Sequence, residues 1–126
     1  MNPLCRDQGV GIIPWSPLAR GLLARAGSDE VTVRAGSDAR IEALYTDADN
    51  DRRILDRVAQ VARERQVPAA QVALAWLLQQ PGVTAPIVGA TKDRHVDDAV
   101  AAVDLALTGQ ELAFLAEPYR PRPVSH

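Results

Sequence analysis

Apolar residues recur every three or four positions in three segments of the second half of the chain. This spacing predicts amphipathic helices at about residues 51–65, 68–80 and 93–104. The side chains expected to face inward are, in the first helix, Ile54, Leu55, Val58, Val61 and Ala62; in the second, Val72, Ala73, Trp76 and Leu77; and in the third, Val96, Ala99, Val100 and Val103.

Capping signals and prolines define the remaining helical segments. Pro68 suits the first turn of the second helix. The sequence from Thr108 to Glu111 is a capping box, which predicts a fourth helix at about 108–117. The proline-rich tail, 118–126, cannot continue it.

Two short runs are apolar without alternation, at about residues 10–14 and 85–88. Continuous apolar runs of this length are typical of strands buried on both faces. Residues 2–8 resemble the end of a helix that stops at Gly9. Residues 15–50 show no sustained period, and we expect a variable loop with a short helix near 39–44.

Strands that alternate with helices predict parallel βα units and an α/β fold. The length of 126 residues suggests a single domain spanning 1–126. Two parallel strands, however, cannot hide both faces and both edges of their own sheet. The pattern therefore predicts part of a larger α/β fold.

The composition excludes several classes of partner and location. The 14 basic residues are scattered among 16 acidic ones, so no basic stripe marks a nucleic-acid face. Cys5 is the single cysteine, and no internal disulfide can form. No apolar run reaches the ~18 residues of a membrane span, and no signal-peptide pattern opens the chain. We expect a cytoplasmic protein that does not bind membranes.

The first candidate for chemistry is the sequence PWSPLARG, residues 14–21, which follows the first predicted strand. Parallel α/β folds bind ligands at the carboxyl ends of their strands. Trp15 offers a flat face to a planar ring, Ser16 a hydroxyl and a peptide N–H, and Gly21 a close backbone approach. The alternative is that Trp15 belongs to the core and the prolines only shape a turn.

The second candidate is APIVGATKDRHVDD, residues 85–98, in which a strand, a glycine and a polar turn lead into a helix. Peptide N–H groups and a helix N-terminus at the end of a strand suit an anion. Lys92 is the only lysine, and Arg94 and His95 follow it. The alternative is a solvated, charged first turn. The two histidines have no metal-ligand spacing, so we expect no metal site.

Taken together, PWSPLARG and PIVGATKDRHVDD resemble the aldo-keto reductase family, and the resemblance covers nearly the whole chain. It implies a (β/α)8 TIM barrel that uses NADPH to reduce aldehydes and ketones. This chain matches the C-terminal part of such a barrel, its last two strands with their helices, and is incomplete as a barrel. Small carbonyl compounds are the implied substrates.

The resemblance also implies cofactor contacts in the first loop. Trp15 matches the aromatic residue that stacks on the nicotinamide. The residues matching the loop at the pyrophosphate are Ser16, Leu18, Arg20 and Gly21.

A second set of implied contacts follows the second strand. The loop at the adenosine 2′-phosphate is matched by Gly89, Ala90, Thr91 and Lys92. His95 stands where the family usually has Arg or Gln beside that phosphate, and Asp98 matches an acidic position near the adenine amino group. Ala99 replaces a frequent Asn, which puts adenine recognition in doubt.

The resemblance assigns no catalytic residue to this chain. The family's catalytic tetrad of Asp, Tyr, Lys and His lies on earlier strands, and neither Tyr45 nor Tyr119 has its context. Met1 falls inside a family helix, from which we expect a truncated or misassigned reading frame and no activity of the chain alone. Three interpretations stay open: a non-enzymatic remnant, half of a split reductase completed by a chain with the missing strands, or a small helical interaction module.

Overall fold

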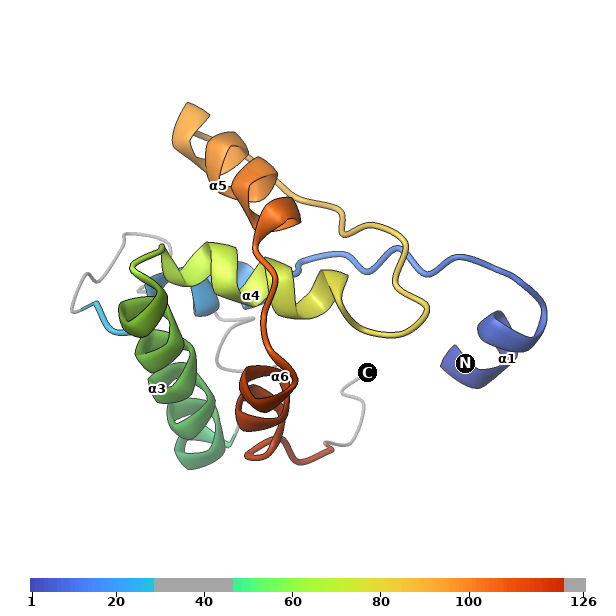
Figure 1. Cartoon of the computed structure of the whole chain (residues 1–126), viewed down its shortest axis with the longest axis horizontal. Coiled ribbons are helices and arrows are strands. Elements are labelled where there is room, and N and C mark those ends of the chain that lie inside the picture. The colour runs from blue at the N-terminus through green and yellow to red at the C-terminus, as the bar shows by residue number, and fades with distance from the viewer. Residues whose placement is uncertain (29–46, 122–126) are drawn as a thin grey trace.

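The central element of the fold is helix α4 (Ala69–Leu78), which has α3 (Ala48–Arg65) and α6 (Gly109–Ala116) on one side and α5 (Asp93–Asp104) on the other (Figure 1). The computed structural model describes residues 1–28 and 47–121. The remaining described helices are α1 (Asn2–Asp7) and the 3₁₀ turns η1 (Ala19–Gly21) and η2 (Leu23–Arg25). The short helix expected near 39–44 and most of the proline-rich tail lie outside the described residues.

The hydrophobic core lies between α3, α4 and α6. Its buried members are Val58, Val61, Ala62, Ala69, Val72, Ala75, Leu107 and Leu115. Trp76 packs against this cluster and donates its indole N–H to the carbonyl of Leu112, at 3.3 Å. Leu74, outside the stripe expected for α4, is also only 2% exposed. The stripe predicted to face inward on α4 therefore named too few residues, because neighbouring elements cover this helix on several sides.

Local signals set the ends of these helices. α3 begins three residues before the expected start, because Asp47 caps it by accepting a 3.1 Å hydrogen bond from the Asn50 peptide N–H. The capping box of α6 is confirmed: the Thr108 hydroxyl accepts from the Glu111 N–H, and the Glu111 carboxylate accepts from the Thr108 N–H. α1 ends as expected before Gly9, which has a φ of +66°. No helix in the described ranges has the length and apolar character needed to cross a bilayer.

Helix α5 faces α4 with other residues than expected. Val96, Val100 and Val103 were expected inward but are 52%, 63% and 69% exposed. Ala102 is buried instead, at 1% exposed, and Asp98 accepts a 2.9 Å hydrogen bond from Gln71 of α4. The small alanine lets the two helices approach closely, which turns the valines away from α4.

Two extended segments, residues 10–15 and 83–88, run side by side in parallel (Figure 1). The Ile12 N–H donates to Gly82 O at 3.2 Å, and the Thr84 N–H donates to Ile12 O at 2.8 Å. A Cβ atom at Gly11 would lie 2.4 Å from the Thr84 hydroxyl oxygen, so a larger residue there would force the Thr84 side chain to move. The expected parallel pairing is therefore present.

The pairing does not extend into strands, contrary to the expectation for residues 10–14 and 85–88. Within the described residues only isolated bridges form, Ile12 with Val83 and Trp15 with Ile87. The sequence supplies the reason. The next bonds of a regular parallel ladder would need peptide N–H groups at Pro14 and Pro86, which proline lacks. Ile87 donates to Pro14 O instead, at 2.8 Å, one residue out of register.

These segments are covered on one face only. Burial alternates from Gly11 to Trp15: Ile12 and Pro14 are half-buried, whereas Ile13 is 60% and Trp15 72% exposed. Ile87 of the second segment is 54% exposed. The expectation that both faces would be buried was wrong for the chain as it stands. Ile13, Trp15 and Ile87 therefore leave apolar side chains exposed on these segments.

Candidate functional site

The loop that follows the first segment has an unusual backbone. Ser16, Ala19 and Arg20 have φ angles of 53°, 49° and 54°, in the left-handed region that non-glycine residues rarely adopt. Gly21 continues it with a φ of 92°. Left-handed conformations cost L-residues roughly 1–2 kcal/mol each, so the surrounding structure must hold this loop in place.

Hydrogen bonds within the loop hold that conformation. The Ala19 N–H donates to Ser16 O at 3.0 Å, and the Gly21 N–H donates to Leu18 O at 2.9 Å. Leu23, which packs against the core, donates its N–H to the same Leu18 carbonyl at 3.3 Å. The loop is thus anchored to the helical body, while Trp15 at its start stays exposed. An exposed indole on a rigid loop can stack against a planar ring.

The second loop leads from residue 88 into α5. Gly89, Ala90 and Lys92 are exposed, and Lys92 occupies the N-cap position of the helix without capping it by its side chain. The Thr91 N–H donates to His95 Nδ1 at 3.3 Å, so this peptide group already has a partner. Asp93 places a carboxylate in the first turn. An anion here would be attracted by the charges of Lys92 and Arg94. It would compete with the Asp93 carboxylate for the positive end of the helix dipole.

The parallel pairing brings the two loops to the same end of the extended segments. Ile87 pairs with Trp15 and bonds to Pro14, and Gly89 follows two residues later. Two parallel segments end at the same edge, so both loops leave from there. Motifs about 70 residues apart in sequence therefore leave the same end of the paired segments and form one candidate site.

Asp98 has a structural partner that sequence analysis missed. Its carboxylate accepts the hydrogen bond from Gln71, which ties α5 to α4. Gln71 is a polar residue in the otherwise apolar segment AAQVALAWLL, and that mismatch was the available signal. The second carboxylate oxygen of Asp98 could still accept a ligand amino group.

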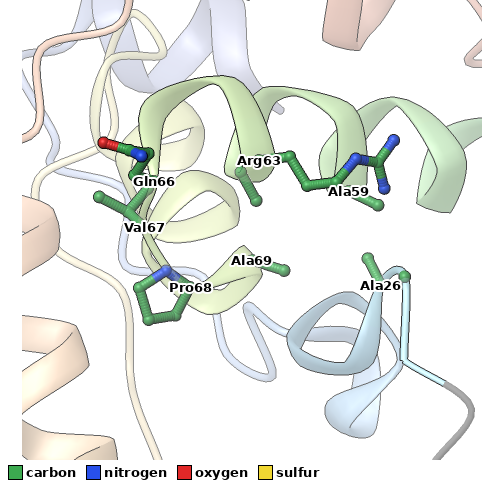
Figure 2. A pocket seen from close by; sticks show the side chains of 9 residues that line it. Ala26, Ala59, Arg63, Gln66, Val67, Pro68 and Ala69 are labelled. Atoms are coloured by element: carbon green, nitrogen blue, oxygen red, sulfur yellow. The ribbon is translucent and has the colours of Figure 1, made fainter.

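Two solvent-open hollows of the described residues lie elsewhere. One, of about 400 Å³, is open to solvent between the C-terminal end of α3, the start of α4 and the turn at Ala26 (Figure 2). Ala59, Pro68 and Ala69 line it, and Arg63 is its only charged residue. None of the predicted cofactor contacts belongs to this lining.

The lowest pKa among the described carboxyl groups belongs to an ion pair between two helices. The Arg65 guanidinium, assisted by the Thr108 peptide N–H, lowers the pKa of Glu111 to about 2. Arg65 donates from Nε and Nη2 to the two carboxylate oxygens, at 2.6 Å each. This pair joins α3 to α6 and shares no residue with the two loops, so its shifted pKa indicates an interhelical ion pair rather than catalysis.

Comparison with known families agrees with this geometry. The sequence model described as "Aldo/keto reductase family" matches residues 1–119. The chain belongs to the aldo/keto reductase family. The resemblance carried by PWSPLARG and PIVGATKDRHVDD is thereby confirmed.

Curated aldo/keto reductase relatives match almost the whole chain. It is 46% identical over 127 residues to the versiconal hemiacetal acetate reductase of Aspergillus parasiticus, covering 98% of this chain and 36% of that protein. It is 43% identical over 125 residues to a putative aryl-alcohol dehydrogenase of Schizosaccharomyces pombe, covering 98% and 35%. The chain thus spans about a third of the length of these relatives.

A solved structure shows the same fold. The glycerol dehydrogenase of Gluconobacter oxydans superposes with a TM-score of 0.70 at 20% sequence identity, covering 99% of this chain and 39% of that one. The arrangement of helices and paired segments is therefore that of part of an aldo/keto reductase. The barrel expected from the sequence is represented here by its helices and two bridged segments, with no continuous strand among the described residues.

Proposed function

We propose that this chain provides the NADP(H)-binding part of an aldo/keto reductase that reduces aldehydes or ketones. The observation that carries the proposal is the Trp15–Ile87 bridge, which joins the loops of both cofactor motifs at one end of the fold. The exposed Trp15 indole would suit a planar nicotinamide ring, and the exposed Lys92 ammonium would suit a phosphate.

The residues of the two loops fit the two ends of such a cofactor. Trp15 would stack on the nicotinamide, and Ser16, Leu18, Arg20 and Gly21 would line the pyrophosphate. Gly89, Ala90, Thr91 and Lys92 would surround the 2′-phosphate, with His95 beside it and Asp98 at the adenine. Because the Thr91 N–H already bonds to His95, Lys92 would provide the main attraction for the phosphate.

The proposed role is to bind and orient the cofactor, which supplies the hydride for carbonyl reduction. Reduction also needs a proton donor at the carbonyl oxygen. We assign no residue of this chain to that step, since Tyr45 and Tyr119 lack the family's tetrad context. The chain alone is therefore expected to bind NADPH without turning over substrate.

Fluorescence titration of NADPH with the purified chain tests the proposal. Trp15→Ala should weaken binding about tenfold, because stacking on an aromatic ring contributes roughly 1–3 kcal/mol. Trp15→Phe, which keeps a flat ring, should retain most of the affinity.

A second pair of variants tests the phosphate end in the same titration. Lys92→Ala should weaken NADPH binding several-fold and leave NADH binding unchanged, because only NADPH carries the 2′-phosphate. Arg53→Ala, at an exposed position of α3, is the matched loss of charge and should change neither. Absence of NADPH binding at millimolar cofactor, or equal binding by wild type and Trp15→Ala, would refute the proposed site.

A further inference from the structure

Arg25 lies beside the first loop of the candidate site, and the sequence motifs do not include it. It is the last residue of the 3₁₀ turn η2, four positions after Gly21. Its side chain folds back onto that glycine, because a Cβ atom at Gly21 would lie 2.8 Å from Arg25 Nη1 and 3.7 Å from Arg25 Cζ. The guanidinium therefore occupies the side of Gly21 on which any other residue would carry its own side chain.

The backbone that carries Arg25 is held on both sides. The Arg25 N–H donates to Leu22 O at 3.2 Å, and the Arg25 carbonyl accepts from the N–H and the hydroxyl of Ser28, at 2.9 Å and 3.0 Å. Leu23, two residues earlier, packs against the core and donates its N–H to Leu18 O of the first loop. The base of the Arg25 side chain is thus fixed to the helical body and to the first loop together.

The guanidinium itself is unpaired. Arg25 is half-buried, yet among the described residues its guanidinium makes no hydrogen bond or ion pair. A guanidinium carries five N–H donors in a planar fork, and polar groups that are shielded from water normally find partners. The fork matches acceptors with two or more oxygens on one centre, as in a carboxylate or a phosphate. The geometry of Arg25 therefore suits an anion that the chain itself does not supply.

The surroundings of Arg25 indicate from which direction the anion comes. A solvent-open hollow of about 480 Å³ lies between η2 and the start of α3, and its charged lining residues balance one another: Arg25, Arg52, Asp51 and Asp56. That hollow does not favour an anion. The first loop, residues 14–21, contains no acidic residue, and its own arginine, Arg20, already has an interaction partner. Arg25 is therefore the unpaired cation next to this loop.

We propose that Arg25 binds the pyrophosphate of the cofactor through its guanidinium, and that Gly21 leaves room for this group. The inference rests on the proposed function, which assigns the pyrophosphate to the first loop. It divides the work between two cations. Arg25 contacts a group that NADPH and NADH share, so it sets the affinity for both cofactors. Lys92 contacts the 2′-phosphate, so it sets the preference between them.

Cofactor titration of variants separates these two roles. Arg25→Gln should weaken NADPH and NADH binding by the same factor, about tenfold, because both cofactors lose a charge-assisted hydrogen bond. Arg25→Lys keeps the charge without the planar fork and should lose about threefold. Arg52→Gln removes an equal charge from the lining of the same hollow and should change neither affinity. A loss confined to NADPH, or an equal loss in Arg52→Gln, would overturn the inference.

Inorganic pyrophosphate tests the contact without the nicotinamide and the adenine. Added to the isotope-labelled chain, it should shift the NMR signals of the Gly21 amide and of the Arg25 Nε–H, and Arg25→Gln should weaken its binding about tenfold. The melting temperature of Arg25→Gln alone should equal that of the wild type, because the guanidinium has no partner to lose. Absence of these shifts at tens of millimolar pyrophosphate, or equal affinities of wild type and Arg25→Gln, would refute the contact.

Gly21→Ala tests the role of the glycine in the same pyrophosphate titration. The added Cβ would displace Arg25 Nη1, and it also strains a backbone with a φ of +92°. The strain is present whether or not Arg25 is there, but the displacement is not. Gly21→Ala should therefore weaken pyrophosphate binding more in the wild type than in Arg25→Gln. Equal effects in the two backgrounds would contradict the role given to Gly21.

Failure of this contact and failure of the cofactor site give different results. NADPH binding that depends on Trp15 but not on Arg25 would keep the cofactor site and refute the Arg25 contact. Binding of inorganic pyrophosphate that depends on Arg25, in a chain that does not bind NADPH, would support the contact as an anion site and refute the proposed cofactor.

Discussion

At the residue scale, the backbone of the first loop is the most informative feature of the candidate site. Ser16, Ala19 and Arg20 hold left-handed φ angles without being glycine. Such strain persists only where surrounding contacts enforce it, and it concentrates at ligand-binding loops. The hydrogen bonds to Ser16 O and Leu18 O are those contacts.

Replacement of Ala19 by glycine should therefore be neutral or stabilising. Glycine removes the left-handed penalty but adds freedom to the unfolded chain, so the net gain is about 0–1 kcal/mol in the free energy of unfolding. Ala24→Gly is the matched control, because Ala24 lies in the next 3₁₀ turn without a positive φ. It should cost about 0.5–1 kcal/mol. Urea unfolding of both variants measures the difference, and an Ala19→Gly variant less stable than Ala24→Gly would contradict the strain.

The chemistry proposed for this loop comes from sequence and stays a prediction, whereas its backbone strain could not be predicted from sequence. Trp15, Ser16 and Gly21 stand out as residue types suited to a ring, a hydroxyl contact and a close backbone. Ala19 gives no signal of strain, because alanine is a common residue in ordinary backbone conformations, whereas glycine is the residue type that usually indicates a positive φ. Gln71, the partner of Asp98, could have been found as a polar residue within an apolar helix.

At the element scale, helices were predicted closely and strands were not, for physical reasons. Helix ends depend on local signals, such as Asp47 before α3 and Thr108 before α6, which are readable from neighbouring residues. The hydrogen bonding between residues 10–15 and 83–88 is interrupted by Pro14 and Pro86, which are far apart in sequence. Only the register of the two segments shows that both prolines fall at hydrogen-bonding positions. The predicted orientation of α5 was wrong. Both its valines and its alanines are apolar, so only the packing against α4 decides which of them are buried.

The Arg65–Glu111 pair between α3 and α6 gives a prediction about pH. Arg65, with the Thr108 N–H, lowers the pKa of Glu111 from 4.5 to about 2. The folded state thus favours the carboxylate, and its contribution to stability is fully present above pH 4.5 and is lost as the pH falls toward 2. Glu111→Gln should cost about 1 kcal/mol at pH 7, a value discounted for the partial exposure of the pair.

That cost should shrink as the pH falls, because the wild type then loses the same charge. Chemical unfolding between pH 7 and pH 2.5 measures the difference between the two proteins. Glu64→Gln is the control, since Glu64 is exposed on α3 and accepts a hydrogen bond from the neutral Gln60. A Glu111→Gln cost that stays constant down to pH 2.5 would show that the ion pair does not hold the two helices together.

At the scale of the whole molecule, stability is unevenly distributed. The helices α3, α4 and α6 share a buried core, whereas α1 has no buried residue and the paired segments are covered on one face. Family membership accounts for this asymmetry, because the chain spans about a third of its relatives and the core of a barrel is shared by all its strands. The sequence indicated this incompleteness because it predicts only two strands, which cannot cover both faces and both edges of their own sheet.

Hydrogen exchange should make this asymmetry visible. In the isolated chain, the Ile12, Thr84 and Ile87 amides should exchange at least about tenfold faster than those of Val72 to Ala75 in α4, because few contacts resist local opening there. Equal protection of Ile12 and Val72 in the isolated chain would mean that the paired segments are stable without any further strand.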